Sequence, residues 1–269
     1  MTTASAKIFE WNAADYAKSS SMQQQWAREL IQKLHLSGNE RVLDVGSGDG
    51  KVSAEIASAL PNGSVLGIDS SLSMVELSQK TFSPDHNSNL RFQLCDAKEI
   101  PFNNEFDVVF SNATLHWIVD HQPVLKGIYT SLKHGGRILL QMGGRGNADV
   151  VKNVMASVVT QNEWKQYFAN FQFAYGFYGP EEYNEWLLEN GFTSVRAELI
   201  PKDGVHKSRE AFAGWFRTTW IPWTNRVPDN LRSIFIDQVV DTYLQQHPAD
   251  ASGAVHVPMM RLEVEAQKV

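Results

Sequence analysis

Residues 41–50, RVLDVGSGDG, decide the fold of this chain. Five residues that read as a short apolar strand run directly into three glycines, Gly46, Gly48 and Gly50. A buried strand followed by a glycine-rich loop and a helix is typical of a parallel α/β sheet. Ligands of such open sheets bind beyond the carboxyl ends of the strands, so this loop is the first candidate for a binding site.

The same order of strand, turn and helix repeats on both sides of this stretch. Short apolar runs predict strands over 41–45, 64–68, 90–94, 106–111 and 137–142. Apolar residues at helical spacing predict helices over about 23–34, 52–60, 74–80 and 124–132. The alternation predicts an α/β fold, a doubly wound Rossmann-like sheet with right-handed crossovers.

The character of the sequence changes after about residue 145. Five of the eight tryptophans lie there, among predicted helices over 149–161, 180–190, 208–219 and 228–246. Strands are predicted over 193–200 and 261–266. We therefore expect an N-terminal helical lid segment (1–36), an α/β core (37–145) and a C-terminal part (146–269). The last part is expected to hold a helical substrate cap over about 203–250 and the final strands of the same sheet.

Composition excludes several classes of protein. With 43% hydrophobic and 20% charged residues, the 269-residue chain has ordinary globular usage. A net charge of −6 disfavours nonspecific nucleic-acid binding. The single cysteine excludes an intrachain disulfide or a cysteine-based metal cluster, and no apolar run approaches the roughly 20 residues that span a bilayer. We expect a cytoplasmic monomer or weak dimer that uses no metal and binds neither membrane nor nucleic acid.

The spacing of the glycines indicates which ligand the loop binds. The dinucleotide fingerprint needs a glycine where this chain has Lys51, and no phosphate-binding G-K-[ST] follows the loop. Asp44 and Asp49 make the loop acidic, which favours a cationic ligand over a pyrophosphate.

Two more acids follow the next two strands. Asp69 stands where a carboxylate can accept hydrogen bonds from a ribose, and Asp96 where one can accept from the adenine amine. Each aspartate alone is as readily explained as a helix cap. Together with the loop, in order and in register with the strands, they predict a site for S-adenosyl-L-methionine (SAM), an adenosine with a positively charged tail.

These segments resemble the motifs of the class I SAM-dependent methyltransferases. LDVGSGDG (43–50) resembles their first motif, GIDSS (67–71) their ribose motif, CDAKEIPF (95–102) their adenine motif and FDVVFSNATLHW (106–117) the segment after their fourth strand. The resemblance implies a seven-stranded sheet whose last strand, about 261–266, is antiparallel. It also implies that SAM is held by nine residues, namely Asp44, Gly46, Ser47, Gly48, Asp69, Ser70, Asp96, Ala97 and Asn112.

A narrower resemblance concerns the methyl acceptor. WN (11–12), Tyr16, NATLHW (112–117), DH (120–121) and PW (222–223) resemble the trans-aconitate methyltransferases nearly end to end. Residues 14–19 with Gln23, and LHW (115–117), resemble the juvenile hormone acid methyltransferases. The malonyl-carrier-protein methyltransferases share the spacing from Tyr16 to Gln23 more loosely. All three families esterify a carboxylate.

The resemblance implies that Gln23 and Trp117 hold that carboxylate as neutral donors. His116 is a third candidate, as a base for an O–H or N–H substrate, although a lone histidine is more often structural. The trans-aconitate enzymes tend to carry an arginine where this chain has Ile221. Three arginines are candidate replacements, namely Arg217, Arg226 and Arg261. The Trp-, Phe- and Tyr-rich cap also suits a more apolar acid.

We therefore expect a SAM-dependent methyltransferase that converts a small-molecule carboxylate into a methyl ester. A carboxylate is already ionised near neutral pH, so in-line transfer needs proximity and orientation rather than a strong base. Three alternatives stay open: a small-molecule N- or C-methyltransferase, a non-catalytic SAM-binding protein, and a dinucleotide-dependent oxidoreductase. The missing third glycine argues against the last.

Overall fold

The structure is a computed structural model that describes the chain from residue 21 to residue 269. The N-terminal resemblance residues, including Trp11 and Tyr16, lie outside the described residues, as do the side chains at 21–23 and 194.

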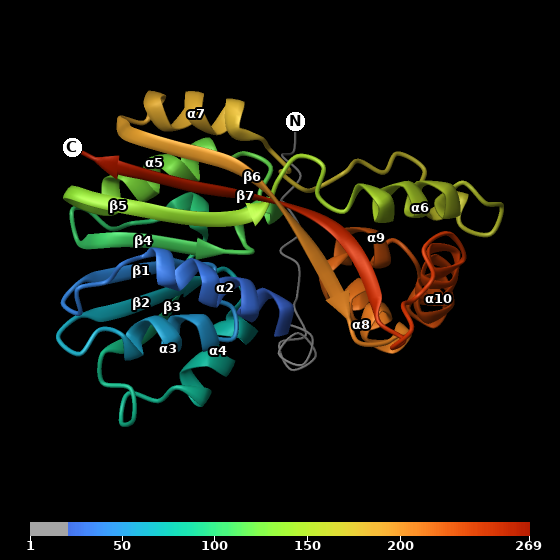
Figure 1. The fold of residues 1–269 in the computed structure, drawn as a ribbon, viewed down its shortest axis with the longest axis horizontal. Coiled ribbons are helices and arrows are strands. Elements are labelled where there is room, and N and C mark those ends of the chain that lie inside the picture. The colour runs from blue at the N-terminus through green and yellow to red at the C-terminus, as the bar shows by residue number, and fades with distance from the viewer. Residues whose placement is uncertain (1–20) are drawn as a thin grey trace, which may run out of the picture.

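A seven-stranded sheet forms the centre of the molecule, in the order β3-β2-β1-β4-β5-β7-β6 (Figure 1). Its strands are β1 (Arg41–Val45), β2 (Ser64–Asp69), β3 (Leu90–Leu94), β4 (Phe106–Asn112), β5 (Leu132–Gly143), β6 (Phe192–His206) and β7 (Val255–Lys268). β1 to β5 pair in parallel, whereas β7 lies between β5 and β6 and is antiparallel to both. The expected α/β sheet with an antiparallel last strand is confirmed.

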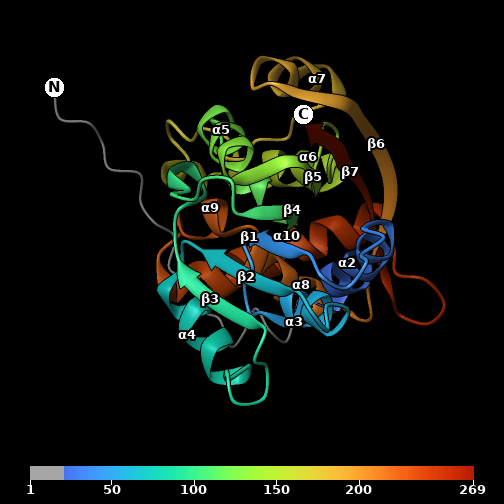
Figure 2. The same ribbon diagram turned by 90° about the vertical axis from the view of Figure 1, so that its left-hand side faces the viewer.

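Helices cover both faces of the parallel part (Figure 2). α2 (Ser21–Lys33), α3 (Lys51–Ser58) and α4 (Leu72–Thr81) pack on one face, and α5 (Gln122–Ser131) and α7 (Pro180–Glu189) on the other. Neighbouring residues Val42 and Leu43 therefore belong to two different apolar clusters. Burial on both faces is the reason that β1 reads as an almost unbroken apolar run.

β6 and β7 continue beyond the sheet as a two-stranded ribbon, paired as far as His206 and Val255. This ribbon carries α8 (Arg209–Thr219), α9 (Ile221–Thr224) and α10 (Asp229–Gln246), while α6 (Asp149–Val159) packs against α10 (Figure 1). Buried aliphatic residues and Met155 of α6 share one apolar cluster with buried aromatic residues of α8, α9, α10 and the segment 164–175. The division into lid, core and cap stays a prediction, but α6 packs with the cap helices.

None of the described helices is both long and apolar enough to span a bilayer. Among residues 21–269 there are also three short 3₁₀ helices, namely η1 (Ala97–Glu99), η2 (Leu115–Trp117) and η3 (Lys165–Tyr167).

Candidate functional site

The glycine loop lies at the carboxyl end of β1. Gly46, Gly48 and Gly50 all have positive φ, and the Gly46 N–H donates to the Ile68 carbonyl oxygen at 2.8 Å. A Cβ on Gly46 would lie within 2.5 Å of three Thr114 side-chain atoms. Glycine is required here because it allows both the left-handed backbone and the close approach to the segment after β4.

Asp69, at the end of β2, holds this loop in place. Its Oδ2 accepts the Gly48 N–H at 3.0 Å, and its Oδ1 accepts the Ser71 N–H at 2.8 Å. Burial raises the pKa of the Asp69 carboxyl despite these hydrogen bonds. Each carboxylate oxygen has a second lone pair, so Asp69 keeps acceptor capacity for a ligand hydroxyl.

Asp44 lies beneath the loop and is 2% exposed. Its Oδ2 accepts a hydrogen bond from Ser53 Oγ at 2.6 Å. Burial raises the pKa of the Asp44 carboxyl to about 7. The hydrogen bond from Ser53 lowers this pKa, and the nearby charge of Asp69 raises it by a smaller amount. A cation nearby would favour the ionised form of this carboxyl.

A pocket opens above the loop, which we call the glycine-loop pocket. It is lined by Gln24, Asp44, Gly46, Ser47, Gly48, Asp49, Lys51, Val52, Asn112, Ala113 and Thr114. Five predicted SAM-binding residues are among them, namely Asp44, Gly46, Ser47, Gly48 and Asn112. The structure therefore brings together the two segments, after β1 and after β4, that the motifs singled out.

The other four predicted residues lie at the adjacent ends of β2 and β3. Asp69 braces the loop as described, Ser70 is exposed and Ala97 is buried. Asp96 caps η1 by accepting the Lys98 N–H at 2.9 Å, and its carboxylate also pairs with Lys98 Nζ at 3.4 Å. Asp96 thus makes the contacts of a cap, and the described geometry does not test its role toward adenine.

A second space, which we call the aromatic cavity, adjoins the glycine-loop pocket. It holds about 520 Å³ of empty volume, including its open mouth, and is lined by Trp26, Ala113, His116, Trp117, Asn147, Tyr175, Phe177, Trp215, Thr219, Trp220, Met259 and Arg261. Ala113, at a φ of 56°, lines both spaces. The two spaces therefore meet at the backbone immediately after β4.

His116 and Trp117 both enter the aromatic cavity from η2. His116 Nδ1 accepts the Gly143 N–H at 3.3 Å, which places the imidazole proton on Nε2. Burial, together with the charge of Arg261, holds the pKa of His116 well below its usual value. His116 is therefore a neutral hydrogen-bond donor and is poorly suited to act as a base.

Arg261 of β7 brings a positive charge to this cavity. The residue is 3% exposed, and its Cζ lies 5.4 Å from the ring centroid of Trp26 on α2. None of the described residues that line the cavity is acidic. Of the other two candidate arginines, Arg217 is exposed, and Arg226 donates to the carbonyl oxygens of residues 167 and 169 outside the cavity.

The N-terminal helix supplies one residue that the sequence analysis missed. The side chain of Gln23 lies outside the described residues, so its predicted role is not tested. The next residue, Gln24, lines the glycine-loop pocket, and its Nε2 donates to Glu55 Oε1 at 2.5 Å. The family resemblance pointed to Gln23, and no motif singled out Gln24.

Comparison with known proteins finds relatives that match most of the chain. A family model described as "Methyltransferase domain" matches residues 36–178. An uncharacterized methyltransferase of Schizosaccharomyces pombe is 30% identical over 239 residues, which cover 82% of this chain and 87% of that one. Trans-aconitate 2-methyltransferase of Variovorax paradoxus is 24% identical, covering 97% of this chain and 99% of that one.

A solved structure shares the fold. Phosphoethanolamine N-methyltransferase 2 of Haemonchus contortus, in complex with S-adenosyl-L-methionine, superimposes with a TM-score of 0.61 at 19% identity. The match covers 95% of this chain and 56% of that one.

Proposed function

This chain belongs to the class I SAM-dependent methyltransferases, and from that premise we propose that it esterifies a small-molecule carboxylic acid. The observation that carries the proposal is Arg261, a buried guanidinium in a cavity that adjoins the glycine-loop pocket at Ala113. A buried positive charge among aromatic rings offsets the cost of removing a carboxylate from water.

The residues of the glycine-loop pocket fit SAM, which supplies an activated methyl group on a sulfonium cation. Asp44 and Asp49 bring two carboxyl groups to the pocket, which suits a cationic ligand, although Lys51 pairs with Asp49 at 2.8 Å. The buried Ser47 Oγ makes no hydrogen bond to a described residue, so it is available to a ligand. In our proposal Asp69 and Ser70 serve the ribose, Asp96 and Ala97 the adenine, and Gly46, Gly48 and Asn112 the amino-acid end.

The acceptor carboxylate, in this proposal, lies between Arg261 and η2. His116 Nε2–H and Trp117 Nε1–H would donate to it beside the guanidinium, with Gln23 as a further donor from the family resemblance. No proton has to leave a carboxylate before it attacks a methyl group. A neutral His116 is consistent with that chemistry, because its task is to orient an oxygen toward the methyl group.

The walls of the cavity favour an apolar acid over a tricarboxylate. Six aromatic side chains line it, namely Trp26, Trp117, Tyr175, Phe177, Trp215 and Trp220, and Arg261 is the only cationic side chain among the described lining residues. Ile221, which stands in the place of the arginine expected from the trans-aconitate enzymes, is buried. We therefore propose an acceptor with one carboxylate and an aromatic or aliphatic body.

A panel of matched acceptors tests this function. The purified protein is incubated with SAM and with aromatic, aliphatic and terpenoid acids, trans-aconitate, and the amines and amides of the same carbon skeletons. S-adenosylhomocysteine release and mass spectrometry of the product are the readouts. Methyl esters formed fastest from apolar monocarboxylic acids are the expected result. Faster turnover of an amine would replace the proposal with N-methylation, and no turnover of any compound would favour a non-catalytic SAM-binding protein.

A further inference from the structure

Helix α2 contacts strand β7 at two points. Trp26 lies against the Arg261 guanidinium, and Lys33 Nζ lies 2.6 Å from Glu263 Oε1. Trp26 and Lys33 are almost two helical turns apart and so lie on one side of α2. Arg261 and Glu263 are two residues apart and so lie on one face of β7. The helix and the strand that build one wall of the aromatic cavity are therefore also joined by an ion pair.

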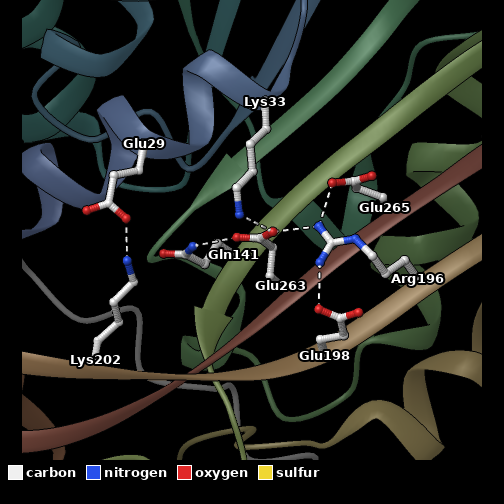
Figure 3. Close-up of polar contacts among 8 residues, drawn as sticks. All are labelled: Glu29, Lys33, Gln141, Arg196, Glu198, Lys202, Glu263 and Glu265. Atoms are coloured by element: carbon white, nitrogen blue, oxygen red, sulfur yellow. Dashed lines mark hydrogen bonds and ion pairs between the residues drawn. The ribbon is translucent and has the colours of Figure 1, made fainter.

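Glu263 is the centre of a larger group of charges (Figure 3). Its side chain is 1% exposed, and it accepts hydrogen bonds from Lys33, from Arg196 Nη2 at 2.5 Å and from Gln141 Nε2 at 3.2 Å. Burial alone would raise the pKa of the Glu263 carboxyl, but the two cations outweigh burial and lower it. Glu263 is thus a buried, ionised carboxylate whose donors come from α2, β5 and β6.

The rest of this group ties the same elements together. Arg196 of β6 also pairs with Glu265 of β7 and with Glu198 of β6. Lys202 of β6 pairs with Glu29 of α2. The pairs of Arg196 join the two antiparallel strands, and the Lys202–Glu29 pair crosses from β6 to the helix between residues 173 positions apart. They leave α2 little freedom to shift along β7.

The opposite side of α2 has a separate anchor on α3. Glu55 accepts the Gln24 Nε2–H at 2.5 Å and pairs with Arg28 Nε at 3.0 Å. Gln24 lines the glycine-loop pocket, whereas Trp26 lines the aromatic cavity. Glu55 therefore anchors the side of α2 that faces the glycine-loop pocket, and Glu263 anchors the side that carries Trp26.

We propose that Glu263 is a positioning residue for the methyl acceptor. By holding Lys33 it sets α2 so that Trp26 covers Arg261 and forms one wall of the aromatic cavity. The inference rests on the proposed function in one respect, namely that the acceptor binds in this cavity. Glu263 itself touches neither substrate, because it acts through Trp26 and Arg261.

Steady-state kinetics of three variants test the inference, using the best acceptor from the panel. Glu263→Gln keeps the shape of the side chain and removes its charge, Lys33→Met removes its partner on α2, and Glu55→Gln weakens the other anchor. We expect Glu263→Gln and Lys33→Met to raise the KM for the acceptor about tenfold. This effect is smaller than the roughly hundredfold fall in rate that a 1 Å misplacement can cause. The KM for SAM should change less than twofold in both. Glu55→Gln should show the reverse pattern.

Two controls keep the outcome interpretable. Lys33→Arg restores a charged donor and should return the acceptor KM to near the wild-type value. Urea unfolding of each variant identifies loss of folding, and Lys33→Met is the informative variant if Glu263→Gln is unstable, because Lys33 is partly exposed.

Equal rises in both KM values, or a fall in kcat alone for Lys33→Met, would overturn the positioning role and leave a merely structural ion pair. The proposed function fails differently, by the absence of acid turnover in the wild-type protein. An amine acceptor from the panel would permit the same comparison of KM values, and a panel without any turnover would overturn both proposals.

Discussion

The glycine-loop pocket and the aromatic cavity share Ala113 but are built from different groups. The pocket uses backbone, glycines and carboxylates at adjacent strand ends, whereas the cavity uses aromatic rings from distant segments and one buried arginine. The first arrangement can specify one polar, cationic molecule closely. The second specifies a charge and a volume, so we expect the cofactor side to be exacting and the acceptor side to be tolerant among apolar acids.

The largest effect should come from removing the charge of the aromatic cavity. Arg261→Met should lower kcat/KM for the acceptor about 30-fold to 1,000-fold, because removing one partner of a buried charged pair costs about 2–4 kcal/mol. SAM affinity, measured by calorimetry, should hardly change. That result would show that the aromatic cavity binds the acceptor and not the cofactor. Arg217→Met, at an exposed arginine, is the control. Wild-type acceptor kinetics in Arg261→Met would remove the basis of the carboxylate proposal.

Asp69→Asn should have the opposite effect, weakening the binding of SAM and leaving the binding of the acceptor unchanged. Loss of a charge-assisted hydrogen bond costs about 1.5–3 kcal/mol, so SAM should bind about 10-fold to 150-fold more weakly. The acceptor KM, measured at saturating SAM, should stay near the wild-type value. Asp85→Asn removes one exposed negative charge and should leave SAM affinity intact. Equal SAM affinity in the two variants would mean that the cofactor binds elsewhere.

A pair of glycine substitutions tests how exacting the cofactor side is. Gly46 and Gly135 have φ of 78° and 79°, but a Cβ at Gly135 meets no atom within 4 Å. Gly135→Ala should therefore report the backbone strain alone, about 1–3 kcal/mol. Gly46→Ala should lower the free energy of unfolding further, because it also forces Thr114 to move. If urea denaturation showed the same loss of unfolding free energy for Gly46→Ala and Gly135→Ala, the loop would tolerate the extra contact with Thr114.

The smallest effect should be a pH dependence confined to the cofactor side. The pKa of Asp44 is raised from 3.8 to about 7 in the folded protein. Its contribution to stability is therefore complete below about pH 4 and is lost as the pH rises through 7. Because SAM is cationic and favours the ionised carboxyl, its affinity should rise toward pH 8, by at most about tenfold per pH unit below the pKa.

Calorimetry between pH 5.5 and 8 checks this pH dependence. Asp44→Asn should flatten it, and S-adenosylhomocysteine, which lacks the sulfonium charge, should show less of it. A flat profile for SAM with the wild-type protein would contradict the assignment of Asp44 to the cationic end of the ligand.

Strands β1 to β4 could be predicted to within one residue, whereas β6 and β7 could not. β1, β2 and β4 are short apolar runs inside the sheet, so the sequence alone marks their limits. The edge strand β3 instead alternates buried Leu90 and Phe92 with exposed Arg91 and Gln93, which is an equally clear strand pattern. β6 and β7 continue through Pro201, Gly204 and Pro258, which read as breaks. Cross-strand pairing along the ribbon, register Pro201↔Met260 to His206↔Val255, overrides those local preferences.

The candidate site divides in the same way. The pocket residues lie in contiguous motifs directly after strands, and the motif order places them together. Trp26 and Arg261 are 235 positions apart in the chain and meet only because β7 inserts beside β5, below α2. In the sequence, Arg261 could not be distinguished from Arg217 or Arg226, since burial depends on contacts that no local pattern encodes.

The position of β7 has a consequence for biosynthesis. Among the described strands, β6 pairs only with β7, which follows it by about 50 residues in the chain. As the protein leaves the ribosome, β1 to β5 can assemble while β6 has no neighbour to pair with. The glycine loop can therefore form before β7 is synthesised. When β7 pairs with β5 and β6, it completes the sheet and places Arg261 beside α2. A nascent chain that stops before residue 255 would carry the glycine loop but lack Arg261, the residue that we propose binds the methyl acceptor.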